Sequence, residues 1–117
     1  MTNLRIKRVY EARSPTDGQR ILVDRVWPRG ISKAKLGDAI WLKEVAPSTE
    51  LRKWFNHRPE RWEQFCTRYT AELNRNSDTI TKLRAMCARG SVTLLYSARD
   101  IEHNQALALA EYLKGIK

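Results

Sequence analysis

Two short polar segments hold the residues best suited to chemistry. In residues 24–30, Arg25 and Arg29 flank a Trp-Pro pair that includes Trp27. Two guanidinium groups held by such a rigid turn could clamp a phosphate or carboxylate, since each charge-assisted hydrogen bond contributes about 1.5–3 kcal/mol. We predict ligand binding by Arg25, Trp27 and Arg29, with Asp24 as a candidate catalytic acid or base. The alternative is a surface turn in which Asp24 pairs with an arginine and Trp27 is core.

The second segment runs from Ser97 to Asn104 and leads into a predicted helix. A helix N-terminus offers unpaired N–H groups and about half a positive charge, which makes it an anion site. We predict ligand binding by Ser97, Arg99 and Asn104. Asp100 and His103 are catalytic candidates, because the positive helix end disfavours imidazolium and leaves a neutral base. The alternative is that Asp100 caps the helix and His103 is an exposed first-turn residue.

The other reactive side chains give weaker signals. His57 and His103 are far apart and have no neighbouring cysteine, so the sequence predicts no metal site. Cys66 and Cys87 fall on apolar helix faces and are predicted to be buried rather than nucleophilic. His57 is predicted to cap a helix end, and the basic pair beginning at Arg52 to face solvent. No glycine-rich nucleotide fingerprint is present, so no cofactor is indicated.

The elements that must position these segments follow from periodicity and turn residues. Strands are predicted at residues 4–10, 20–26, 39–46 and 91–96. A short turn is predicted at 32–36, and helices between residues 48 and 58, 59 and 73, 77 and 90, and 100 and 115, with N-caps at Ser48, at Ser77 or Asp78, and at Asp100.

The strand at residues 91–96 has a continuous apolar run, which is typical of a central strand covered on both faces. This order predicts a three-layer α/β domain spanning residues 1–117, with a small, mainly parallel sheet flanked by helices. Ligands collect at the carboxyl ends of strands in such sheets. Both polar segments fall at strand ends of this kind.

The charge is high and uneven. The 117 residues carry a formal net charge of +9. Residues 1–58 hold 13 Lys and Arg against 6 Asp and Glu, whereas residues 59–117 hold 9 against 7. A basic half favours an anionic partner, such as a phosphorylated metabolite or nucleic acid, although the charge could also serve solubility alone.

Several protein classes are excluded by composition. No apolar run approaches the roughly 20 residues of a membrane span. The first residues alternate charge and hydrophobe and therefore lack a secretory signal pattern. Two cysteines cannot form a disulfide framework. The sequence predicts a cytoplasmic protein with no membrane partner and leaves its oligomeric state open.

Long motifs resemble the YeaO-like family, a group of small bacterial proteins that share a domain of unknown function. They are Val23 to Gly30, Trp41 to Ser48, and Leu94 to Asp100 with Glu102, His103 and Asn104. The resemblance implies an α/β fold and a cytoplasmic protein, but no agreed activity, catalytic residue or cofactor. Longer, distant relatives carry Cys and His near Tyr96 to Asn104. Tyr96 and Asn104 depart from that pattern, which argues against shared thiol chemistry.

The sequence thus leaves three functional hypotheses. The first is that the two polar segments converge on one pocket that binds an anionic small ligand, phosphorylated or carboxylated, with or without catalysis. The second is a basic nucleic-acid binding module, which predicts a continuous basic face and salt-sensitive affinity. The third is a non-catalytic partner-binding protein, which predicts an exposed apolar patch.

Overall fold

The computed structural model describes residues 3–115 and contains one four-stranded sheet. Its strands are β1 (Leu4–Arg8), β2 (Gln19–Leu22), β3 (Ile40–Trp41) and β4 (Val92–Tyr96). The order across the sheet is β1-β4-β2-β3, and every neighbouring pair is parallel. All five residues of β4 are buried, which confirms the predicted central strand.

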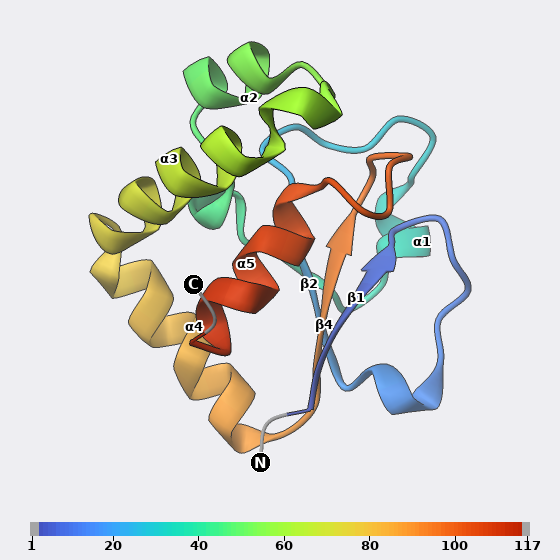
Figure 1. Ribbon diagram of the computed structural model, residues 1–117. Coiled ribbons are helices and arrows are strands. Elements are labelled where there is room, and N and C mark those ends of the chain that lie inside the picture. The colour runs from blue at the N-terminus through green and yellow to red at the C-terminus, as the bar shows by residue number, and fades with distance from the viewer. Residues whose placement is uncertain (1–2, 116–117) are drawn as a thin grey trace.

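Helices lie on both faces of the sheet (Figure 1). One face carries α2 (Thr49–Phe55), α3 (Trp62–Asn74), α4 (Ser77–Arg89) and α5 (Gln105–Leu113). The other face carries the four-residue α1 (Lys33–Leu36) together with the loops on either side of it. The result is the predicted three-layer α/β fold, and no helix within residues 3–115 is long and apolar enough to cross a membrane.

Side chains alternate between two apolar cores because successive strand residues point to opposite faces. Ile21 and Leu94 belong to the larger core, beneath α2 to α5. Leu22 and Leu95, one residue further along, belong to the smaller core beneath α1. The neighbouring strands β2 and β4 are therefore packed on both faces. Their carboxyl ends position the two polar segments.

Several predicted boundaries were wrong. β1 ends at Arg8 rather than at residue 10. β2 ends at Leu22 rather than at residue 26, and the following Asp24 side chain forms loop contacts instead. The strand predicted at 39–46 shortens to β3, because residues 43–45 close into a 3-10 turn. α4 has Asn76 as its N-cap, not Ser77 or Asp78. The side chain of Asn76 donates to the Glu44 carbonyl instead of capping the helix.

A charged cluster is buried against the smaller core. Asp17 is 3% exposed and accepts hydrogen bonds from the Lys7 ammonium at 3.0 Å and from the Ser14 N–H. The Arg20 Nε lies 3.6 Å from the same carboxylate, an ion pair longer than a hydrogen bond. The Thr93 hydroxyl donates to the Asp17 carbonyl at 2.7 Å. The turn before β2 is thereby joined to β1 and β4.

This arrangement shifts the acid–base behaviour of Asp17. Burial by itself raises the pKa of a carboxyl group. At Asp17 the hydrogen bonds from Ser14 and Lys7, together with the positive charges of Lys7 and Arg20, outweigh burial and hold the pKa below its usual range. The cluster therefore stabilises the ionised carboxylate.

Candidate functional site

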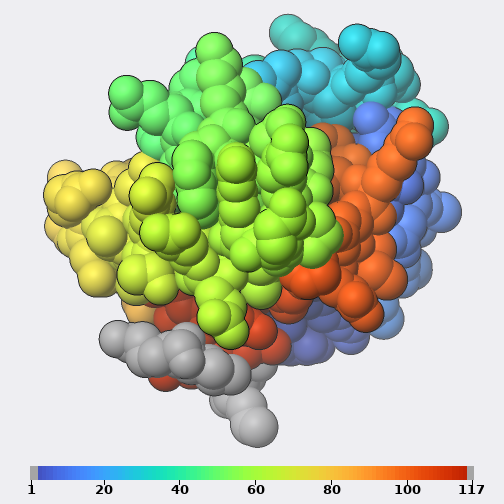
Figure 2. Space-filling view, turned by 45° about the horizontal axis from the view of Figure 1, so that its top comes forward, coloured from blue at the N-terminus to red at the C-terminus, as the bar shows by residue number. Residues whose placement is uncertain are grey.

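A cavity of about 510 Å³ opens at the carboxyl ends of β2 and β4. The loop after β2 forms one side, the loop before α5 a second, and α2 with the start of α3 a third. Figure 2 shows the green residues of α2 and α3 beside the orange residues that follow β4. The lining consists of Asp24, Arg25, Val26, Pro47, Arg52, Phe55, His57, Phe65, Ser97, Ala98, Arg99, Asp100, His103, Asn104 and Gln105.

Asp24 joins the two polar segments. Its carboxylate accepts a hydrogen bond from the Ser97 N–H at 3.1 Å and another from the Gln105 side-chain amide. Burial raises the pKa of Asp24, although the hydrogen bonds from Ser97 and Gln105 and the positive charge of Arg52 oppose the shift. The two segments thus meet through a buried carboxylate, and they line one cavity.

Arg25 is committed to the backbone of a neighbouring loop. Its Nε donates to the Pro47 carbonyl at 2.8 Å and its Nη2 to the Ala46 carbonyl at 3.1 Å. These bonds fix the loop that leads into α2. Arg25 lines the cavity, but two of its donors already have partners.

Trp27 and Arg29 lie outside the cavity lining. The Trp27 indole N–H donates to the Ile31 carbonyl at 2.6 Å. The Trp27 and Trp41 rings pack in a T-shaped arrangement, with their centroids 5.2 Å apart. Arg29 is exposed, and its carbonyl accepts a hydrogen bond from the Tyr10 hydroxyl. These two residues therefore do not line the cavity that Asp24 and Arg25 line.

The loop after β4 is held by its own side chains. Asp100 accepts hydrogen bonds from the N–H groups of Glu102 and His103, and its Oδ2 lies 2.9 Å from His103 Nδ1. Burial acts to raise the pKa of Asp100, but the hydrogen bonds from Glu102 and His103 outweigh it and the pKa is lowered. Asp100 and His103 form a carboxylate–imidazole pair at the cavity.

Asp100 does not cap the last helix as predicted. The N-cap of α5 is Asn104, whose side-chain oxygen accepts the Leu107 N–H at 2.9 Å. Its amide group donates to the Asp100 carbonyl at 3.0 Å. Asp100 instead closes the turn before the helix, so His103 precedes the helix and does not lie in its first turn.

We expect Asn104→Ala to lower the free energy of unfolding by about 1–2 kcal/mol, the usual cost of losing an N-cap. Asn104 is 2% exposed, and its side-chain amide also donates to the Asp100 carbonyl. The substitution removes this buried hydrogen bond together with the cap. Asn104→Asp, which keeps the capping oxygen, should restore part of the stability. Urea unfolding monitored by circular dichroism measures both, and equal stabilities of the alanine variant and the wild type would contradict this role.

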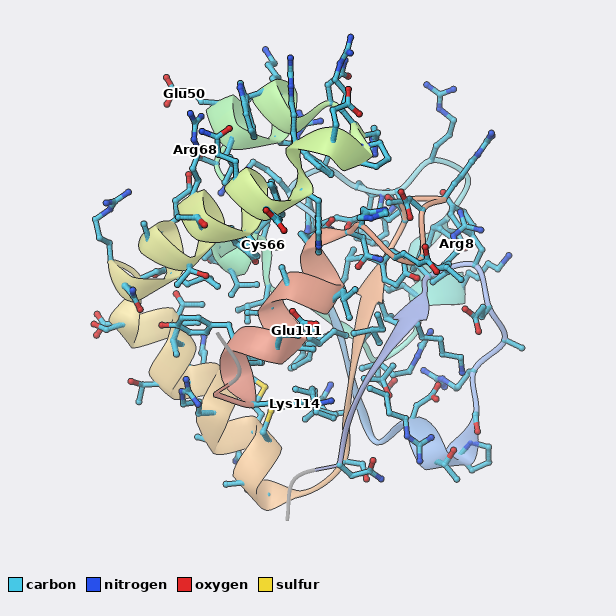
Figure 3. The ribbon with its side chains drawn as sticks, in the orientation of Figure 1. Arg8, Glu50, Cys66, Arg68, Glu111 and Lys114 are labelled. Atoms are coloured by element: carbon cyan, nitrogen blue, oxygen red, sulfur yellow. The ribbon has the colours of Figure 1, made fainter. Side chains whose placement is uncertain are left out.

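The backbone of the loop after β4 is held by Arg8 at the end of β1, which is labelled in Figure 3. Its Nε donates to the Ala98 carbonyl at 2.9 Å and its Nη2 to the Ser97 carbonyl at 3.0 Å. Ser97 contributes its N–H to Asp24 and also lines the cavity. Arg99, between these contacts and Asp100, is exposed and lines the cavity.

Arg52 and His57 were not predicted to belong to the site. Arg52 was placed on a solvated helix face and His57 at a helix cap, yet both line the cavity. One signal for Arg52 was available, because it lies three residues before the buried Phe55, at the border of the apolar stripe of α2. His57 and the preceding Asn56 both have left-handed backbone conformations, with φ of 54° and 48°. No glycine marks that turn in the sequence.

Two of the three cavity arginines, Arg52 and Arg99, differ from the two cavity acids in their bonding. The Arg52 and Arg99 guanidinium groups make no hydrogen bond or ion pair with residues 3–115. Asp24 and Asp100, in contrast, accept hydrogen bonds from neighbouring groups. The cavity thus presents two available cations beside acids that are already bonded.

Other chemistry-bearing groups lie away from the cavity. Cys66 is half-buried between α3 and α5, with Glu111 nearby (Figure 3). Burial and the charges of Glu111 and Glu63 raise its pKa to about 11, so the thiol stays protonated at neutral pH. Within the described chain no group of three His, Cys, Asp or Glu side chains could hold a metal ion.

Comparison with known proteins places this chain in a family. A family model described as "Inactive DUF488-N3 subclade" matches residues 3–116. The chain belongs to this subclade. An uncharacterized protein of Mycobacterium tuberculosis, Rv3073c, is 46% identical over 114 residues, covering 97% of this chain and 96% of the relative.

A second relative supports the resemblance found in the motifs. Uncharacterized protein YeaO of Escherichia coli is 43% identical over 114 residues, covering 97% of this chain and 99% of YeaO. The YeaO-like resemblance is thereby confirmed. No solved structure matches this chain significantly. Both relatives match this chain along almost their whole length, and both are described as uncharacterized.

Proposed function

We propose that this protein binds a small anionic ligand, phosphorylated or carboxylated, in the cavity between the loop after β2 and the loop before α5. The observation that carries the proposal is the pair of cavity guanidinium groups, Arg52 and Arg99, which make no ion pair or hydrogen bond with residues 3–115. A guanidinium with free donors matches the paired oxygens of a phosphate or carboxylate.

The cavity acids offset only part of this attraction. Asp100 is bonded to the Glu102 and His103 N–H groups and to the His103 ring, and Asp24 to Ser97 and Gln105. Their oxygens are turned to protein donors, which reduces the repulsion that an incoming anion meets. Arg25 adds positive charge, although its role in the proposal is to hold the loop before α2.

We propose a binding role without turnover. The subclade carries the description "inactive", which supports binding over catalysis. Asp24, Asp100 and His103, the candidates for proton transfer, then hold the two loops in place through their hydrogen bonds within the protein. Hydrolysis of phenyl phosphate by the purified protein, followed as released inorganic phosphate, would contradict this role.

We expect Arg52→Ala and Arg99→Ala each to weaken binding of inorganic phosphate about tenfold or more. A charge-assisted hydrogen bond contributes about 1.5–3 kcal/mol, and a tenfold change corresponds to about 1.4 kcal/mol. Isothermal titration calorimetry at fixed ionic strength, or amide shifts in ¹H–¹⁵N spectra, measures the dissociation constants. The double variant should show no saturable binding.

Arg29→Ala is the matched control. Arg29 is an exposed arginine of the loop after β2, but it lies outside the cavity lining. Its loss removes the same charge from the protein and should change phosphate affinity by less than about twofold, since exposed charges are screened by salt. Equal losses in all three variants would indicate nonspecific attraction to the basic surface and would overturn the proposal.

A further inference from the structure

The cavity has a second side that an inorganic anion would leave unused. Phe55, Phe65 and Pro47 line it, and all three are buried residues of α2, α3 and the preceding loop. The volume of about 510 Å³ lies within the range of about 300–1,000 Å³ that is typical of pockets for drug-sized organic ligands. The cationic residues therefore occupy only part of the lining.

The apolar side belongs to a preformed aromatic cluster. The ring centroids of Phe55 and Phe65 are 4.6 Å apart, and Trp62 stacks on Phe65 at 5.6 Å. The Trp62 ring also meets His103 edge-on at 5.4 Å. Rings that already pack on one another lose little freedom when a ligand arrives, which favours binding of a flat apolar group.

Val26 extends the apolar side toward solvent. It is 57% exposed and lines the cavity from the loop after β2. Ile101, in the opposite loop, is 63% exposed but does not belong to the lining. The two residues are comparable in size and exposure, and they differ in whether a bound ligand could touch them.

The charges limit how much of the ligand can be anionic. Asp24 and Asp100 share the cavity with Arg52 and Arg99, so a ligand charged along its whole length would approach carboxylates as well as guanidinium groups. A ligand with one anionic end can place that end at the arginines and its uncharged body elsewhere. The lining therefore disfavours polyphosphates and other polyanions.

We propose that the ligand is a small organic anion with one phosphate or carboxylate group and an aromatic or similarly bulky apolar body. The inference rests on the proposed function, because Arg52 and Arg99 hold the anionic end. The body packs against the apolar side lined by Pro47, Phe55 and Phe65, and Val26 covers it at the mouth.

Three phosphates test this inference: inorganic phosphate, methyl phosphate and phenyl phosphate, titrated by calorimetry at one pH and one ionic strength. We expect phenyl phosphate to bind at least tenfold more tightly than the other two. Equal affinities of all three would overturn the inference while leaving the proposed function in place. Failure of all three to bind would overturn the proposed function itself.

Val26→Ser locates the apolar contact. We expect it to weaken phenyl phosphate binding about threefold or more and to leave inorganic phosphate binding unchanged. Ile101→Ser is the control and should change neither. Both positions are exposed, so neither substitution should disturb folding. Equal effects of the two substitutions on phenyl phosphate would overturn the assignment of the mouth contact.

An aromatic phosphate could also come from a phosphotyrosine side chain of another protein. We assign the site to a free small molecule, because the cavity volume is that of a whole small ligand. A short phosphotyrosine peptide should therefore bind no more tightly than phenyl phosphate. A peptide that bound tenfold more tightly would overturn the small-molecule assignment.

Discussion

Asp17→Asn should lower the free energy of unfolding by about 3–5 kcal/mol, the usual cost of breaking a buried ion pair by removing one partner. The substitution keeps the shape of the side chain and removes its charge. Arg20, 5% exposed, and Lys7, part-buried, then lose the carboxylate that compensates them. Urea unfolding at pH 7 measures the difference.

Asp38→Asn is the control for this experiment. Asp38 also pairs with an arginine, Arg13, but the two side chains are 86% and 53% exposed. An exposed pair contributes no more than about 1 kcal/mol. Equal losses at Asp17 and Asp38 would mean that burial of the cluster contributes nothing to its effect.

Acid titration gives the Asp17 prediction a second readout. Because the pKa of Asp17 is held below that of an ordinary aspartate, about 3.9, its contribution is fully present above that pH. The contribution is lost as the pH falls through the folded-state pKa. The stability difference between the wild type and Asp17→Asn should therefore be largest near neutral pH and shrink below about pH 4.

Gly18→Ala should lower the free energy of unfolding by roughly 3–5 kcal/mol. Gly18 precedes β2 with a φ of 67°, and an added Cβ would lie 2.2 Å from the Ser91 carbonyl oxygen. Backbone strain in this region costs about 1–3 kcal/mol, and overpacking adds about 1–3 kcal/mol. The clash is with the backbone beside β4, so relief requires moving the two strands apart.

Gly30→Ala separates strain from clash. Gly30 has a φ of 80°, but nothing lies within 4 Å of an added Cβ. Gly30→Ala should lower the free energy of unfolding by about 1–2 kcal/mol, the backbone strain of an alanine in the left-handed conformation. If thermal or urea unfolding gave the same loss at both glycines, close packing of Gly18 on Ser91 would have no energetic role.

The fold could be predicted where local sequence and tertiary packing agree. Ser32 and Gly37 enclose α1, and Ser48 caps α2, because each side chain or glycine serves its own neighbouring backbone. The apolar run of β4 marks a strand with both faces covered. In these segments the residues that determine the structure lie within a few positions of one another.

Prediction failed where the deciding contact is distant in sequence. Val45 lies in a 3-10 turn instead of the predicted strand. Its carbonyl accepts a hydrogen bond from the hydroxyl of the buried Tyr69 in α3. Asp100 and Asn104 are both good N-cap residues, and local pattern alone could not choose between them. Their roles follow from how the chain leaves β4 and packs on the sheet.

The site was predictable as a place and less so as a set of residues. Asp24 and Ser97 fall at neighbouring strand ends, so parallel topology brings them together. The direction of a loop arginine depends on carbonyls that the sequence does not reveal, as the bonds of Arg25 to Ala46 and Pro47 show. Arg52 lies in α2, which the topology places on another side of the cavity.

The position of β4 at the centre of the sheet has a consequence for synthesis on the ribosome. β1 and β2 are both translated early, yet each pairs with β4, which begins at Val92. At about 5–20 residues per second, β1 waits several seconds for its partner strand. A nascent chain that ends before Val92 can form β2–β3 pairing but cannot join β1 to the sheet. Folding of this domain therefore cannot be completed before β4 has been synthesised.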